Sequence, residues 1–179
     1  GVHRLLVGDC TDPANVARLM GGERADMVLT DPPYGMDLDT DWSDAVGQLT
    51  STSRQHQTKG GTYERVIGDD EPFDPAHIFE LFGYCKEMFL WGADYYAERI
   101  PERIKGSWLV WDKRKESQSE AIGAEFELCW SKAKHKRRML RHDWFGFLSS
   151  SNPKEARNRE HPTQKPTSLM IDIIQQWAK

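Results

Sequence analysis

The sequence predicts an α/β fold in which a mostly parallel sheet is covered by helices on both faces. Apolar runs at residues 4–8 and 27–30 are typical of short buried strands. Between them, Asp12 precedes helically spaced apolar residues, and Gly21-Gly22 ends that pattern. A strand, a helix and a second strand in succession favour parallel pairing, with the helix packed on the sheet.

The rest of the chain continues this alternation. We expect helices over 75–84, 94–103 and 167–178, and strands over 88–91, 108–111 and 126–130. Residues 37–69 contain almost no periodic apolar residues, so we expect a mobile loop there, either functional or a plain disordered insertion. The length of 179 residues suits a single domain, 1–179, with its own core.

The composition is that of a soluble globular protein, with 38% hydrophobic and 29% charged residues. No apolar run reaches the length of a membrane span, and the chain does not begin like a secretory signal. Three cysteines without a close pair favour a reducing compartment, and we expect a cytoplasmic protein. The six histidines show no metal-ligand spacing, so we expect no metal.

Basic residues are concentrated in one segment, although the formal net charge of the chain is −4. A local basic patch can follow the phosphates of a nucleic acid even on an acidic chain. A charge run by itself is more often a solvated face. The basic residues of this segment are Lys132, Lys134, Lys136, Arg137, Arg138 and Arg141.

The strongest chemical signal is the sequence Asp31-Pro32-Pro33-Tyr34, which follows the apolar run at 27–30. Open α/β sheets place their ligands at the carboxyl ends of strands. The two prolines lack an N–H group, so carbonyl groups there face the site without competing donors. An amine could donate to both the Asp31 carboxylate and the Pro32 carbonyl, and Tyr34 offers a flat face for a base. The alternative is a plain strand-to-loop turn.

Two further segments carry polar groups beside a predicted helix or strand end. Before the last helix, Thr163, Gln164 and Lys165 offer a hydroxyl, an amide and a cation, a set suited to a carboxylate near a helix N-terminus. Near the start of the chain, Asp9-Cys10 follows the first apolar run. Taken alone, the first segment is more typical of a helix-capping loop, and the second of a strand-end cap.

Together, these segments resemble the DNA amino methyltransferases that act on adenine N6 or cytosine N4, in their permuted order. LLVGDC, ADMVLTDPPYG and HPTQKP occur in the family's order and spacing, and FLWGADYY, SWLVWDK and FELCWSK resemble its later strands. The resemblance covers nearly the whole chain and implies a permuted, Rossmann-like methyltransferase fold. In that family a glycine-rich cofactor loop follows the last helix. The sequence contains no such loop, so we expect a fold that is incomplete at the C-terminus and a weakened cofactor site.

The resemblance also implies the role of each site residue. The catalytic residues would be Asp31, Pro32, Pro33 and Tyr34. S-adenosyl-L-methionine would be bound by Asp9, Cys10, Asp31, His161, Thr163, Gln164 and Lys165. The methyl group would pass directly to the amine of a flipped-out base in DNA. Target recognition would fall in about 131–160, whose lysines and arginines would contact phosphates.

Several alternatives remain open at this stage. Asp at the first position of the tetrapeptide favours adenine N6, and cytosine N4 is the alternative within the same family. An RNA or protein amine is another possible substrate. A different class is a non-catalytic DNA-binding or partner subunit with a vestigial site. A homodimer and a restriction-modification partner are also open.

Overall fold

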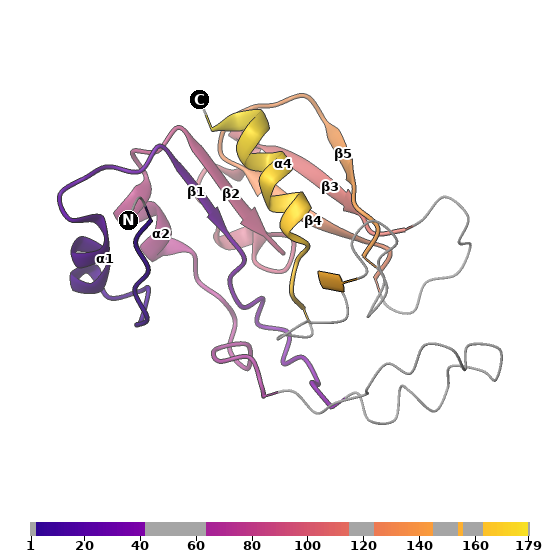
Figure 1. The fold of residues 1–179 in the computed structure, drawn as a ribbon, viewed down its shortest axis with the longest axis horizontal. Coiled ribbons are helices and arrows are strands. Elements are labelled where there is room, and N and C mark those ends of the chain that lie inside the picture. Colours follow the sequence, from indigo (N-terminus) through magenta and orange to yellow (C-terminus); the bar gives the residue numbers. More distant parts are fainter. Residues whose placement is uncertain (1–2, 42–63, 115–123, 145–153, 156–162, 179) are drawn as a thin grey trace.

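The computed structural model describes residues 3–41, 64–114, 124–144, 154–155 and 163–178. In these parts of the chain, five strands form one sheet in the order β1-β2-β4-β3-β5 (Figure 1). The strands are β1 (Met27–Thr30), β2 (Glu87–Trp91), β3 (Ser107–Asp112), β4 (Phe126–Ser131) and β5 (Arg138–Arg141). The helices include α1 (Pro13–Met20), α2 (Ala76–Phe82) and α4 (Thr167–Trp177), with short 3-10 turns η2 (Ala97–Arg99) and η3 (Arg103–Lys105).

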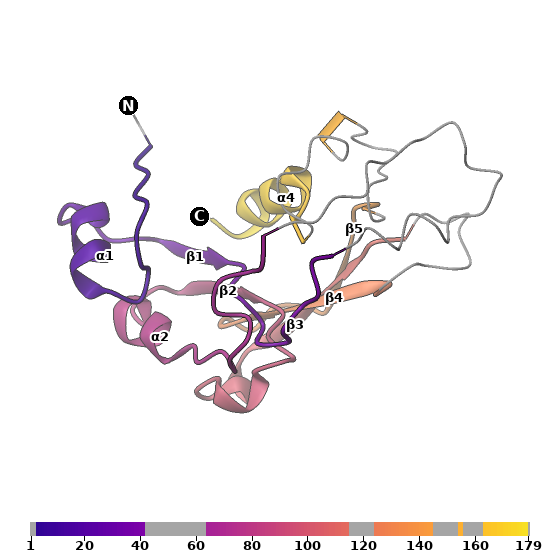
Figure 2. The ribbon, with the colours of Figure 1, turned by 90° about the horizontal axis from the view of Figure 1, so that it is seen from below.

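Helices lie on both faces of the sheet, as the sequence predicts. Seen from below, α4 covers one face, and α2 lies on the opposite side (Figure 2). Alternate residues of β2 divide between two cores: Phe89 and Trp91 pack in the cluster that contains Leu169 of α4, whereas Met88 and Leu90 pack with the α2 side. This period of two is what a strand covered on both faces requires. The α/β class is therefore confirmed.

The sheet is mixed: β1, β2, β3 and β5 run in one direction and β4 runs against them, so the prediction of a mostly parallel sheet holds except at β4. β1 pairs with β2 and β3 with β5 in parallel, but β4 runs antiparallel to both β2 and β3. The last residue of β3 lies opposite the first residue of β4, Asp112 opposite Phe126. Strands that follow each other in this way form a hairpin, whereas parallel neighbours need a long crossover. The antiparallel direction of β4 becomes important for the site.

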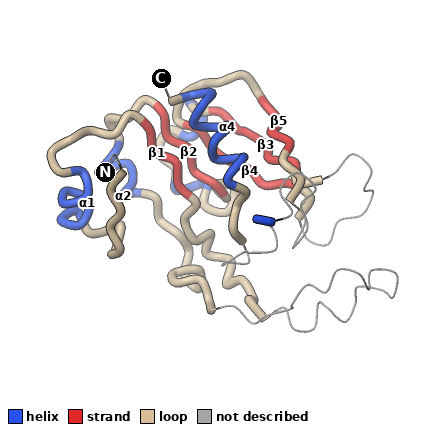
Figure 3. The backbone as a smooth tube through the Cα atoms, in the orientation of Figure 1, coloured by secondary structure: helices blue, strands red, loops and turns tan. Residues whose placement is uncertain are grey.

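Two predicted elements have a different structure. Residues 4–8 form no strand; Leu5 and Val7 are each 92% exposed, and Figure 3 shows this part of the chain as loop. A strand is stable only when a neighbour accepts its hydrogen bonds, and no described strand pairs with this segment. Residues 94–103 form turns that include η2 instead of an α-helix. Pro101 lacks the N–H that a continuous helix would need there.

The other predicted elements agree with the structure to within a few residues, whereas β5 lies in the basic segment, for which no strand was predicted. The Asp12 carboxylate caps α1 by accepting the Ala14 N–H at 2.9 Å, and Gly21 ends the helix in the left-handed conformation at φ 57°. Within the described ranges, each helix is too short or too polar to cross a membrane. Trp91, Trp111 and Trp130 are buried in the strands.

Helix α4 is attached to the sheet by its apolar side, which provides a first test of the fold. We expect Leu169→Ala to lower the free energy of unfolding by about 2–5 kcal/mol, because Leu169 is completely buried between α4 and the sheet. Ile174→Ala is the matched control on the same helix, because Ile174 is nearly half exposed. Urea unfolding followed by circular dichroism measures both changes. Equal losses in the two variants would contradict the packing described here.

Candidate active site

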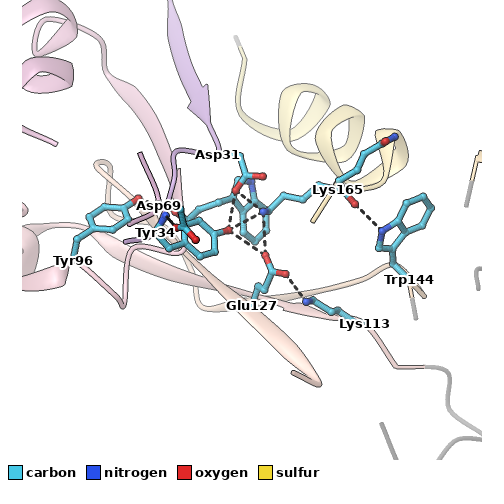
Figure 4. Close-up of polar contacts among 10 residues, drawn as sticks. Asp31, Tyr34, Asp69, Tyr96, Lys113, Glu127, Trp144 and Lys165 are labelled. Atoms are coloured by element: carbon cyan, nitrogen blue, oxygen red, sulfur yellow. Dashed lines mark hydrogen bonds and ion pairs between the residues drawn. The ribbon is translucent and has the colours of Figure 1, made fainter. Parts of the chain in front are cut away.

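The candidate site is built around Asp31 at the end of β1. Asp31 directly follows β1, and the chain then turns at Pro32 and Pro33 so that the Tyr34 hydroxyl donates to Asp31 Oδ1 at 2.8 Å (Figure 4). Lys165, immediately before Pro166 and α4, reaches the same carboxylate. The structure therefore brings Lys165 to the tetrapeptide of Asp31 and Tyr34, from which it is far removed in the sequence.

The ammonium group of Lys165 is enclosed by acceptors and aromatic rings. Its Nζ lies 2.5 Å from Asp31 Oδ1, 2.8 Å from Tyr34 Oη and 3.1 Å from Glu127 Oε2. It also lies 5.3 Å and 5.4 Å from the ring centroids of Tyr34 and Trp91, within the range of cation–π interactions. The side chain is only 3% exposed. The geometry thus holds a buried amine against the Asp31 carboxylate.

Glu127, on β4, is a site residue that the sequence analysis missed. One carboxylate oxygen pairs with Lys165 at 3.1 Å, and the other pairs with the ammonium group of Lys113 just after β3. Burial acts to raise the pKa of Glu127, but the positive charges of Lys165 and Lys113 outweigh it, so the pKa lies below its ordinary value. An acid inside the apolar run FELCW was the available signal.

Asp69 shapes the loop that carries the tetrapeptide. Its carboxylate is buried and accepts the backbone N–H groups of Tyr34, Gly35 and Leu38, each at 2.9 Å. The loop therefore has a fixed path even though it is not helix or strand. Gly35 follows this path with φ 73°, where a Cβ atom would lie 2.6 Å from the Glu71 carbonyl oxygen. The sequence analysis placed Asp69 at the end of a mobile loop, most of which lies outside the described residues.

The Tyr34 ring is held by residues that follow β2. It stacks on Tyr95 with ring centroids 5.4 Å apart and planes 20° apart. Gly92 passes so close that a Cβ atom there would lie 2.2 Å from Tyr34 Cε1. Burial raises the pKa of the Tyr34 hydroxyl, and the carboxylates of Glu127 and Asp31 raise it further. The hydroxyl thus stays protonated and is a permanent donor toward Asp31.

The other predicted cofactor residues that the structure describes have surroundings of their own. The Asp9 carboxylate accepts the N–H and the hydroxyl of Thr11, at 2.8 and 2.7 Å, and these two bonds lower its pKa. Cys10 beside it is exposed. Near Lys165, the Gln164 carbonyl accepts from the Trp144 indole at 2.7 Å, and Thr163 is exposed. His161 lies outside the described residues.

The basic residues of the predicted DNA-binding segment differ in their surroundings. Lys132 donates to the carbonyl groups of Gly83 and Cys85, so its ammonium group holds the loop after α2. Arg138 donates to Gln176 of α4 at 2.5 Å, and Arg141 lies 3.9 Å from Asp112. Both arginines are nevertheless exposed, as are Lys134, Lys136 and Arg137. The prediction that these residues contact DNA is left as a proposal.

The site suits a positively charged group. The carboxylates of Asp31 and Glu127 and the rings of Tyr34 and Trp91 surround one cation, Lys165. The indole N–H of Trp91, in contrast, is a buried donor for which the described residues provide no acceptor. Among the described residues, no group of three histidine, cysteine or acidic side chains is placed to bind a metal ion, and the expected lack of a metal stays a prediction.

The chain is similar to one curated protein by sequence. It is 26% identical over 192 residues to a protein of Escherichia coli (strain K12) named "Putative methylase YubD", a match that spans 99% of this chain and 71% of that protein. No family model matches the chain, and no solved structure matches it. The similarity supports the methyltransferase class. It does not extend to the acceptor, the modified atom or a Rossmann methyltransferase fold.

The lowered pKa of Glu127 predicts how stability depends on pH. Because the folded state binds the Glu127 proton less tightly than the unfolded chain, this carboxylate stabilises the fold above the ordinary glutamate pKa of about 4.3. That contribution is lost as the pH falls toward the lowered value. We expect Glu127→Gln to lower the free energy of unfolding at pH 7 by about 1–3 kcal/mol, and the difference from wild type to shrink between about pH 5 and pH 3.

Urea unfolding at a series of pH values measures this dependence. Glu98→Gln is the control, because Glu98 is exposed and lies outside the network. A difference between wild type and Glu127→Gln that stays constant from pH 7 to pH 3 would contradict the ion pairing.

Proposed function

We propose that this chain is an S-adenosyl-L-methionine-dependent methyltransferase that modifies the N6 amine of a flipped-out adenine in DNA. The observation that carries the proposal is the amine held at the end of β1. Asp31 accepts a hydrogen bond from the Lys165 ammonium group beside the Tyr34 ring. A base amine that reached Asp31 would find the same acceptor and the same ring. The similarity to a protein named as a methylase supports the class of reaction.

The residues of the tetrapeptide have separate tasks in this proposal. Asp31, which is one-third exposed, accepts an N–H of the target amine and so turns the nitrogen lone pair away from the base ring. Pro32 and Pro33 offer carbonyl groups and no competing N–H. Asp69 keeps the loop in place, so that these acceptors are arranged before the substrate arrives. The cofactor supplies the methyl group on a positively charged sulfur when it is bound.

Stacking of the base involves a pair of tyrosines. Tyr34 already stacks on Tyr95, and Tyr95 is 56% exposed. We propose that the base stacks against this pair, an interaction of about 1–3 kcal/mol in nucleic-acid sites. The pair thus adds an exposed ring to the Tyr34 face proposed from the sequence.

The DNA backbone would be bound by the exposed cations near β5. Lys134, Lys136 and Arg137 are exposed, and Arg138 and Arg141 lie on the strand itself. We propose that these five residues contact phosphates, which position the duplex without reading its sequence. We expect Lys132 to contribute less to phosphate binding, because its ammonium group already donates to two carbonyl groups. Binding by this segment should weaken steeply with salt.

The experiment that tests the function is a direct assay of the modified nucleoside. The purified protein is incubated with DNA and S-adenosyl-L-methionine that carries a labelled methyl group, and digested nucleosides are separated by chromatography with mass detection. We expect N6-methyladenine. N4-methylcytosine would assign the alternative base. The absence of a labelled nucleoside, together with the absence of cofactor binding by calorimetry, would refute the proposal.

The role of Asp31 is tested by Asp31→Asn. This change keeps the shape of the side chain but removes the charge that orients the amine, and we expect the rate of methyl transfer to fall by roughly 10²–10³-fold. Asp26→Asn is the matched control, because Asp26 is an exposed acid immediately before β1, at the opposite end of the same strand. Asn is preferred to Ala because Asp31 is an ion-pair partner of buried Lys165. Methyl transfer at the wild-type rate in Asp31→Asn would exclude the assigned role.

A further inference from the structure

We infer that Glu127 is a positioning residue that holds the Lys165 ammonium group while Asp31 binds the target amine. The inference rests on the proposed function and deepens it. Lys165 Nζ lies 2.5 Å from Asp31 Oδ1 and 3.1 Å from Glu127 Oε2, so a single cation is shared between two carboxylates. The target amine needs the first of these carboxylates. The second is therefore the counter-charge that remains available to Lys165.

Burial makes this second partner necessary. The Lys165 side chain is 3% exposed, so water cannot replace a lost carboxylate. A buried charge without a partner is strongly unfavourable, and such a charge would oppose any movement of Asp31 toward substrate. Tyr34 cannot take this role, because its oxygen is a neutral acceptor 2.8 Å from Nζ. Glu127 is the other acid that contacts Lys165 among the described residues.

Glu127 is held firmly enough to act in this way. It lies within β4, where it pairs with Trp111 of β3 in the register of the sheet. Its other carboxylate oxygen binds Lys113, whose ammonium group also lies 5.1 Å from the ring centroid of Trp111. The network contains two acids and two lysines, so its net charge is zero. Binding a neutral amine at Asp31 leaves that balance unchanged.

Replacing Glu127 by Gln would upset the balance. Among the described acids Lys165 would then contact only Asp31, and it would compete with the target amine for that carboxylate. Catalysis would suffer although Glu127 itself touches neither the base nor the methyl donor in this proposal. We therefore expect Glu127→Gln to weaken binding of the target amine to Asp31 and to leave cofactor binding unchanged.

The ion pairing can be tested without any activity assay. Lysine side chains are labelled briefly with an acetylating reagent, and the modification of each lysine is measured by peptide mass spectrometry. In Asp31→Asn, which removes one partner, Lys165 should stay as protected as in wild type, because Glu127 still holds it. In the double variant Asp31→Asn with Glu127→Gln, we expect labelling of Lys165 to be at least ten-fold faster.

Two lysines and one conservative variant act as internal controls. Lys86 is exposed and should be labelled at the same rate in all variants, and Lys132, bonded to two backbone carbonyls, reports whether the fold is intact. If the double variant unfolds, Asp31→Asn with Glu127→Asp keeps the charge and should protect Lys165 again. Labelling of Lys165 in Asp31→Asn as fast as in the double variant would overturn the inference, whether or not the protein methylates DNA.

Kinetics then separate positioning from a merely structural role. In Glu127→Gln we expect kcat/KM for DNA to fall ten-fold or more, while KM for S-adenosyl-L-methionine stays within two-fold of wild type. Glu127→Asp should recover most of the loss. A similar loss toward both substrates, or no recovery by Asp, would count against Glu127 as a positioning residue. If wild type shows no methyl transfer, the proposed function fails and the labelling result alone decides the pairing.

Discussion

The buried ammonium group of Lys165 is the constraint on which the site depends. A cation that is 3% exposed must be paired, and its partners come from β1 and β4 while the lysine itself precedes α4. Three separate segments therefore converge on one point. The apolar packing of α4 against the sheet holds the lysine above the strand ends, and the ion pairs complete the attachment.

The direction of β4 explains how Glu127 enters the site. In the parallel pair β1 and β2, the carboxyl ends lie at one edge of the sheet, next to Asp31. β4 runs the opposite way, so its first residues come to this same edge, opposite the end of β3. If the sheet were parallel throughout, Glu127 would lie at the far edge. The antiparallel strand thus adds a second carboxylate to the site. The rule that ligands bind at the carboxyl ends of parallel strands does not predict this residue.

The sequence predicted the features that depend on neighbouring residues. It did not predict the features that depend on contacts between distant segments. The cap of α1 and the loop at Pro32-Pro33 follow from local preferences, and both were predicted. The pairing of Glu127 with Lys165 needs the register of the hairpin, which no local pattern contains. The segment at 4–8 failed for the same reason, because an apolar run becomes a strand only beside a partner. The stack of Tyr34 on Tyr95 likewise joins the ends of two strands that are far apart in the sequence.

The difference in exposure between Asp31 and Lys165 decides how an amine can reach the site. Asp31 is 32% exposed, whereas Lys165 is 3% exposed, so a ligand meets the carboxylate first and from the solvent side. Lys165 can stay buried while Asp31 accepts a second donor, because its ammonium group can move closer to Glu127. Such a shift stays within hydrogen-bonding distance of both acids. The same buried cation that organises the site can therefore remain in place during substrate binding, provided that the second carboxylate is present.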